Sequence, residues 1–158
     1  MRFNPGVFDL WVFRRSEAEV EYLLLHTSQV KADRFFGGGR YWQVPSEVFR
    51  AGETAVAAID RVMMRHGLQG RAIWAAEHVY TIYNRRFEEL QVITVFAVEV
   101  DADTAGVELD PAEHATHAWL PYEEALKRVH YRGLRDGLRS TREYVTGVAE
   151  PAAELRLR

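Results

Sequence analysis

The sequence predicts an α+β fold in which a mixed β-sheet is flanked by helices. Apolar runs of strand length occupy residues 7–13, 20–25, 72–83 and 90–100, and a polar turn separates the two runs of each pair. Apolar residues at helical spacing follow the first pair and again follow the last. Strands, a helix, strands and further helices in this order favour a mixed sheet with helices packed against it.

Length and composition limit the number of domains that the chain can form. A chain of 158 residues, 47% apolar and 27% charged, can bury one core, so we expect one domain over 1–150 and a frayed tail over 151–158. The net charge of -3 argues against nucleic acid as a partner, and the absence of cysteine excludes disulfides and thiolate sites. No apolar run suits a signal peptide or a membrane span, so we expect a cytoplasmic protein with no membrane partner.

The first elements are a hairpin, a loop and a short strand. Residues 7–13 and 20–25 are predicted to pair across a polar turn. The polar stretch 27–40 ends in three glycines and is predicted to be a mobile loop. A short strand over 41–44 then ends at Pro45.

The second half begins with an amphipathic helix. Thr54 can cap this helix and Gly67 ends it, with apolar residues at helical spacing between them. Residues 72–83 and 90–100 are predicted to form a second hairpin. The remaining predicted elements are a short strand and two helical segments, over residues 117–120, 122–129 and 134–145.

The segment between Trp42 and Leu68 resembles a Nudix box, whose pattern is G-x5-E-x7-R-E-U-x-E-E-x-G-U with U aliphatic, usually preceded by Trp-x-x-Pro-Gly-Gly. The matching residues are Trp42-Gln43-Val44-Pro45-Ser46-Glu47, Gly52-Glu53-Thr54, Ala57-Ala58 and Gly67-Leu68. Downstream residues resemble a segment common in nucleoside triphosphate pyrophosphohydrolases of this family, namely Glu113-His114, Trp119-Leu120 and Glu123-Glu124-Ala125-Leu126. The resemblance covers about residues 7–145 and implies an α/β/α sandwich.

The resemblance also implies a chemistry. In the family, a loop, a helix and a second loop carry Mg²⁺ or Mn²⁺, which bridges a diphosphate while water attacks a phosphorus atom. Hard cations held by several carboxylates neutralise the charge that develops on the phosphate oxygens. Glutamates one and four residues apart converge at one helix end, where they can hold such an ion.

The metal-binding glutamates of the box are missing from this sequence. Between Glu53 and the closing glycine the chain is one residue too short, so two alignments are open. Anchored at the glycine, the paired glutamates become Met64 and Arg65. Anchored at Glu53, they become Arg65 and His66, and the box arginine is kept as Arg61. An arginine in place of a carboxylate ligand removes an attraction and adds a repulsion, each a few kcal/mol at an effective dielectric constant of about 20.

Several acids could still build a displaced metal site. Glu53 and Glu113 are the candidate catalytic residues, and Glu47, Glu53 and Asp60 are the candidate ligands for Mg²⁺ or Mn²⁺. Glu47 stands where the family has a glycine. The alternative, which we favour, is that Glu53 supports the helix start, that Asp60 lies on a solvated helix face, and that no metal cofactor is used.

The candidate substrate-binding residues are Arg34, Trp42, Tyr83 and Arg85. Arginine suits phosphate oxygens, and an aromatic ring can stack on a nucleobase. The alternative is that these side chains only complete the core and keep the surface soluble. His66 is interpreted as a cation at the end of the box helix rather than as a ligand.

Three functions remain open. The first is a divergent pyrophosphohydrolase acting on a nucleoside triphosphate or a substituted nucleoside diphosphate through relocated carboxylates. The second is a catalytically eroded relative that binds a nucleotide-like small molecule or a protein. The third is a regulatory module or homodimer whose exposed strand faces a twin subunit. We favour the second, because positioning without charge neutralisation leaves the phosphoryl-transfer barrier largely intact.

Overall fold

Strand β1 (Arg2–Arg15) runs through the middle of the structure and separates two buried layers. Successive side chains of a strand point to opposite faces. Trp11 and Phe13 therefore enter one apolar cluster, whereas Leu10 and Val12 enter the other. A strand that is buried on both faces needs apolar residues at nearly every position. This explains the apolar run over residues 7–13, which only Asp9 interrupts.

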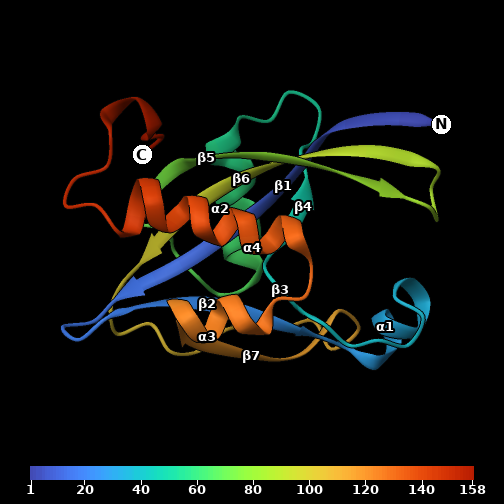
Figure 1. Cartoon of the computed structure of the whole chain (residues 1–158), viewed down its shortest axis with the longest axis horizontal. Helices are drawn as coiled ribbons and strands as arrows, with labels where there is room; N and C mark the ends of the chain where they lie inside the picture. Colours follow the sequence, from blue (N-terminus) through green and yellow to red (C-terminus); the bar gives the residue numbers. More distant parts are fainter.

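The computed structural model describes residues 1–158 (Figure 1). The other strands are β2 (Val20–Thr27), β3 (Trp42–Gln43), β4 (Ser46–Val48), β5 (Ala72–Asn84), β6 (Glu89–Val100) and β7 (His114–Pro121). The helices are α1 (Gln29–Phe35), α2 (Ala55–Arg65), α3 (Tyr122–Arg128) and α4 (Arg132–Thr141), followed by a π-helix (Arg142–Thr146) and a 3₁₀ turn (Ala153–Leu155). None of the helices has the length and apolar character needed to cross a bilayer.

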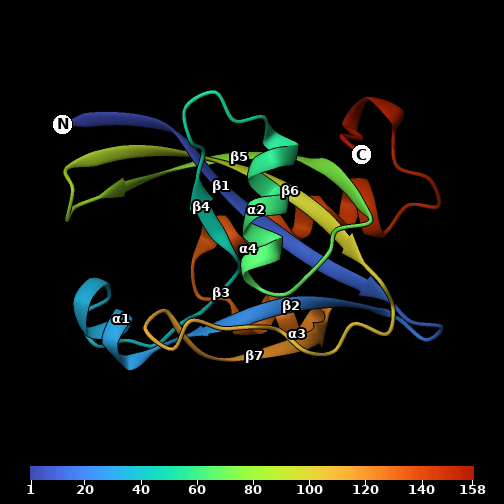
Figure 2. The same ribbon diagram turned by 180° about the vertical axis from the view of Figure 1, so that it is seen from behind.

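The sheet is mixed, as predicted. Its main path runs β3, β2, β1, β6, β5, with β4 paired to β1 and β7 paired to β2. Strands β1 and β6 are parallel, and the other pairs are antiparallel. Both predicted hairpins are confirmed, since β1 pairs with β2 and β5 pairs with β6. Helix α2 packs on one face, seen in front in Figure 2, and α3 and α4 pack on the other.

Two local predictions differ from the structure. Residues 27–40, expected to be a mobile loop, contain α1, which begins because the Ser28 side chain accepts a hydrogen bond from Lys31 N. The C-terminal residues, expected to be frayed, are held against β5 by a backbone hydrogen bond from Leu157 N to Ile73 O of 2.8 Å. The Arg158 guanidinium adds hydrogen bonds to Asp60 on α2.

Candidate functional site

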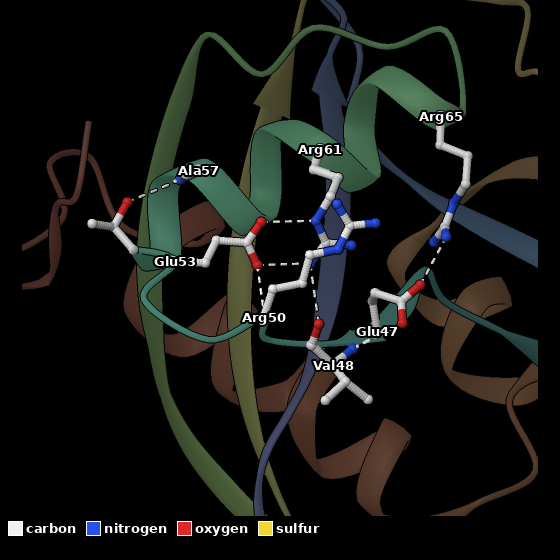
Figure 3. A network of polar contacts seen from close by, with 8 residues as sticks. Glu47, Val48, Arg50, Glu53, Ala57, Arg61 and Arg65 are labelled. Atoms are coloured by element: carbon white, nitrogen blue, oxygen red, sulfur yellow. Dashed lines mark hydrogen bonds and ion pairs between the residues drawn. The ribbon is translucent and has the colours of Figure 1, made fainter.

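Helix α2 forms the centre of the candidate site, at the position of the box helix. Gly52 takes a left-handed φ of 75° in the turn before it, a conformation that favours glycine. Thr54 then caps the helix by accepting a hydrogen bond from Ala57 N. Ile59 and Val62 are buried against the sheet, so the charged side chains Arg61 and Arg65 lie on the other side of the helix (Figure 3).

Arg61 binds Glu53 through two hydrogen bonds. Nε and Nη2 each lie 2.8 Å from a carboxylate oxygen, and Arg50 N donates to the same carboxylate at 2.9 Å (Figure 3). The Arg61 hydrogen bonds, with that of Arg50 N, lower the pKa of Glu53 to about 2. The alignment anchored at Glu53 keeps Glu53 and Arg61 at box positions, and in the structure these two residues form an ion pair. The missing residue then falls between His66 and Gly67.

Arg65 binds Glu47 of the short strand β4. Its Nη1 lies 2.7 Å from a Glu47 oxygen, and Val48 N donates to the other oxygen at 3.0 Å. Burial alone would raise the pKa of Glu47, but the hydrogen bonds from Arg65 and Val48 N bring it below its ordinary value. Glu47 occupies a box glycine position and Arg65 occupies a box glutamate position. These two departures from the pattern therefore form one ion pair.

The other two candidate acids are also paired. Asp60 accepts two hydrogen bonds of 2.8 Å from the Arg158 guanidinium. Glu113, just before β7, lies 2.7 Å from Lys31 Nζ of α1. All four acids predicted as catalytic residues or metal ligands thus have a cationic partner.

The residues present do not fit Mg²⁺ or Mn²⁺. A hard cation needs about six oxygen ligands, several of them carboxylates. No group of three or more histidine, aspartate and glutamate side chains is arranged so that it could hold a metal ion. Glu53 and Glu113 in particular are held in different ion pairs on different elements. We therefore derive no step through a metal ion.

Two histidines lie at the far end of α2. His66 and His114 are buried, and their ring centres are 6.5 Å apart. His66 Nδ1 donates to Glu108 O at 2.9 Å. Burial lowers the pKa of both rings, that of His114 to about 4, with further lowering there from Lys31. The lowered pKa favours the neutral ring of His66 and argues against the interpretation of His66 as a cation at the helix end.

The predicted substrate-binding residues lie on three separate elements. Arg34 belongs to α1 and Trp42 belongs to β3. Tyr83 lies at the end of β5, and Arg85 lies in the turn after it. Arg86 connects the first and last of these elements, because its Nη1 donates to Arg34 O at 2.8 Å. The structure thus brings α1 and the β5–β6 turn together. It shows no contact of Tyr83 or Arg85 with Trp42.

Trp42 lies in a group of rings and arginines. The His26 ring stacks on it with centres 4.5 Å apart, and the Arg128 guanidinium lies 5.5 Å from its centre. Arg40 donates to His26 Nδ1 at 3.4 Å. Beside Trp42, the Tyr41 ring stacks on His130 with centres 4.5 Å apart. Sequence reasoning missed His26 and Arg128, which the fold brings to Trp42, and His130, which it brings to Tyr41.

Four arginines in this region lack a carboxylate partner, unlike those of α2. Every ion pair of the chain involves other residues. We give the name arginine–aromatic surface to Arg34, Arg40, Arg86, Arg128, Tyr41 and Trp42. Arg128 lies over the Trp42 ring, and Arg34 and Arg86 lie over the Phe35 ring of α1. The arginines of this surface are exposed and its rings are half-buried. Unpaired guanidinium groups next to aromatic rings can bind phosphate and stack on a base.

A buried carboxyl group lies in β1, where this strand pairs with β4. Asp9 of β1 is 3% exposed, and it pairs in register with Ser46. The Tyr80 hydroxyl donates to its carboxylate. Burial raises the pKa of Asp9 to about 6, despite the hydrogen bonds from Tyr80 and Ser46. The one signal in the sequence was an acid within an otherwise apolar strand.

A hollow of about 360 Å³ lies elsewhere, between β2, α3 and the π-helix, with Tyr22, Tyr122 and Arg142 in its wall. It contains no residue of α2, and it is open to solvent. None of the four candidate acids lies in its wall.

Solved structures with the same fold identify the architecture. A protein of Listeria monocytogenes assigned as a Nudix hydrolase superimposes with a TM-score of 0.76 at 17% identity, covering 94% of this chain and 99% of that one. The Ap4A hydrolase of C. elegans gives 0.68 at 17% identity, covering 94% and 100%. The Nudix domain of Shewanella oneidensis NrtR, in complex with ADP ribose, gives 0.67 at 14% identity, covering 90% and 89%.

Sequence comparison gives no such match. No protein-family model matches the chain, and neither does any curated protein sequence. The likeness therefore rests on three-dimensional structure, over nearly the whole length of both chains. By its sheet order, its box helix and these neighbours, the chain has the Nudix fold.

Proposed function

We propose that this protein binds a nucleotide-like, phosphate-bearing small molecule and does not hydrolyse it through a divalent cation. One observation carries the proposal: Glu47 and Glu53, the acids nearest the box helix, are ion-paired with Arg65 and Arg61 of that helix. A carboxylate held by a guanidinium group has to break that pair before it can bind a cation. Phosphoryl transfer depends on positioning together with charge neutralisation. Because Glu47 and Glu53 are paired with arginines, they are not free to hold a cation that would neutralise the phosphate charge.

The arginine–aromatic surface supports the binding half of the proposal. Arg40 and Arg128 are exposed cations that form no ion pair with a carboxylate of the chain, and Arg128 lies over the Trp42 ring. Guanidinium groups recognise phosphate in a bidentate manner. The NrtR Nudix domain, which was crystallised with ADP ribose, is a precedent for a nucleotide-type ligand on this fold. The net charge of -3 favours such a small molecule over nucleic acid.

Equilibrium binding measured with and without metal tests the proposal. Nucleoside diphosphates, nucleoside triphosphates, dinucleotides and nucleotide sugars are titrated once in EDTA and once in Mg²⁺, and release of phosphate and pyrophosphate is assayed in parallel. We expect at least one ligand to bind equally well in EDTA and to remain intact. Metal-dependent cleavage that Glu53→Gln abolishes would instead establish the divergent pyrophosphohydrolase. Failure of every ligand to bind would remove the binding half of the proposal.

A further inference from the structure

His26 of β2 lies next to the arginine–aromatic surface. Its ring stacks on Trp42 with centres 4.5 Å apart, and the two residues pair in register between β2 and β3. On the other flank of β3, Trp42 forms a β-bridge with Val129, the residue after Arg128. The side chain of His26 is half-buried, so a solute can reach its ring.

The contact between Arg40 and His26 depends on a neutral imidazole. A guanidinium group only donates hydrogen bonds, so the contact of 3.4 Å from Arg40 Nη2 to His26 Nδ1 needs a ring nitrogen that accepts. At this length the hydrogen bond is weak. The Arg40 Nε also donates to Thr27 O at 2.9 Å, which holds the guanidinium beside the ring. Protonation of His26 would turn Nδ1 into a donor and place two cations side by side.

The charged groups that act on His26 are cations. Burial lowers the pKa of the ring below its ordinary value, Arg40 and Arg128 lower it further, and a hydrogen bond with the Arg40 backbone opposes them. No carboxylate is among the groups that shift it. On the flank of β2 away from β3, β7 places Thr116 opposite His26, and threonine does not titrate. The arginines that we propose as phosphate ligands therefore also favour the neutral form of the ring.

A bound anion would reverse this balance. A phosphate group on Arg40 neutralises a cation that opposes the protonation of His26. Its oxygens can accept hydrogen bonds from the guanidinium and from a protonated ring at the same time. Hydrogen bonds between ionised groups are roughly twice as strong as those between neutral ones. The weak contact between Arg40 and His26 is thus exchanged for two stronger ones.

We propose that His26 is a phosphate-binding residue, which takes up a proton when an anionic group binds Arg40. The proton comes from the solvent, and the ligand is not altered. The inference rests on the proposed binding of a phosphate-bearing molecule and adds a regulation by pH to it. Proton and anion favour each other's binding equally. The affinity for the ligand therefore falls as the pH rises, by up to roughly tenfold for each pH unit while the bound His26 loses its proton.

The titration of His26, followed by nuclear magnetic resonance in chloride and in sulfate at equal ionic strength, tests the proposal. Sulfate resembles a phosphate dianion but takes up no proton near neutral pH, so any change comes from the protein. We expect sulfate to raise the pKa of His26 by about one pH unit, which means about tenfold tighter binding of sulfate to the protonated ring. His117 of β7 is the internal control, because it pairs with Leu25, whose side chain points to the other face of β2. Its titration should be the same in both salts.

Two variants assign the effect to the arginine. Arg40→Gln removes the cation beside the ring, so the pKa of His26 in chloride should rise and the further rise in sulfate should be lost. Arg71→Gln is the matched control, since Arg71 is exposed and paired with Asp101. It should change neither value. Circular dichroism confirms that each variant is folded.

Three results would overturn the proposal: a pKa of His26 that is equal in chloride and sulfate, an equal response of His117, or an Arg40→Gln variant that responds to sulfate as the wild type does. The wild-type measurement needs no variant, so a misfolded variant does not remove the test. A response of His26 to sulfate in a chain that binds no nucleotide would support the anion site and overturn the proposed function alone. A nucleotide without a terminal phosphate that binds equally well at pH 6 and pH 8 would overturn the proton linkage alone.

Discussion

Arg65 donates a hydrogen bond of 2.7 Å to Glu47, and so joins the end of helix α2 to strand β4. In the alignment that retains Glu53 and Arg61, these two residues replace a metal-binding glutamate and a loop glycine of the box. The replacement puts the positive charge of Arg65 at the helix end where the pattern has a negative one, and Glu47 pairs with it. The acids of the site are therefore held in ion pairs and do not form a cluster that could bind a cation.

Reducing the positive charge at residue 65 should raise the metal affinity step by step. Arg65→Gln frees Glu47 and removes the repulsion, and Arg65→Glu adds a second carboxylate beside it. We expect the affinity for Mn²⁺ to rise on the order of tenfold at each step, as changes of one to two kcal/mol imply. Calorimetric titration measures this. Arg139→Glu, on α4 and away from the site, serves as the charge control, and an equal gain there would contradict the explanation.

The pair formed by Glu53 and Arg61 should make stability sensitive to acid. The pKa of Glu53 in the folded chain is about 2, below the ordinary value of 4.5. A depressed carboxyl pKa contributes stability that is present above pH 4.5 and is lost as the pH falls towards 2. We expect the free energy of unfolding of the wild type to fall more steeply in this window than that of Glu53→Gln. Urea denaturation at several pH values measures the difference, and parallel curves would show that the pair contributes nothing.

Asp9 should have the opposite dependence on pH. Its pKa in the folded chain is raised to about 6 from 3.8, so folding favours the protonated form and stability falls as the pH rises from 3.8 to 6. Asp9→Asn, which cannot ionise, should therefore equal the wild type below this window. Above it, the variant should be more stable by on the order of 3 kcal/mol. Guanidinium denaturation at pH 4 and pH 8 tests this, and an equal difference at both values would argue against the burial effect.

The arginine–aromatic surface should determine ligand affinity. Arg40→Gln and Arg128→Gln each remove an exposed cation without a carboxylate partner, and each should weaken binding of a phosphate-bearing ligand roughly tenfold or more. Arg71→Gln is the matched control, because Arg71 is exposed but paired with Asp101. Titration of the best ligand in EDTA gives the three affinities. A loss as large for Arg71→Gln would point to general electrostatics.

The elements with a strong local signal were predictable from the sequence. Helix α2 has a cap at Thr54, apolar residues at helical spacing and a glycine stop, and the structure places it as expected. Helix α1 was missed because it has seven residues, only Ala32 among them is buried, and three glycines follow it. Strand β4 was missed because three residues at an edge carry no periodicity. Helix formation by tertiary contact leaves little trace in a local pattern.

The candidate site was predictable only in part. The eight-residue spacing from Glu53 to Arg61 is visible in the sequence, and the structure turns it into a pair of hydrogen bonds. The pairing of Arg65 with Glu47 depends on how β4 and α2 are placed next to each other, and Lys31 of α1 meets Glu113 just before β7. Interactions between residues far apart in the chain leave no periodic pattern, so only the fold could reveal them.

The most direct test of whether the paired acids can bind a divalent cation is a titration of Mn²⁺ into the wild-type chain. It is followed through the electron paramagnetic resonance signal of the free ion. We predict that the signal grows in proportion to added Mn²⁺, with no saturable site below about millimolar concentration, where hard cations bind only weak sites. A saturable micromolar site that Glu53→Gln or Glu113→Gln removes would contradict the account and restore a metal-dependent mechanism.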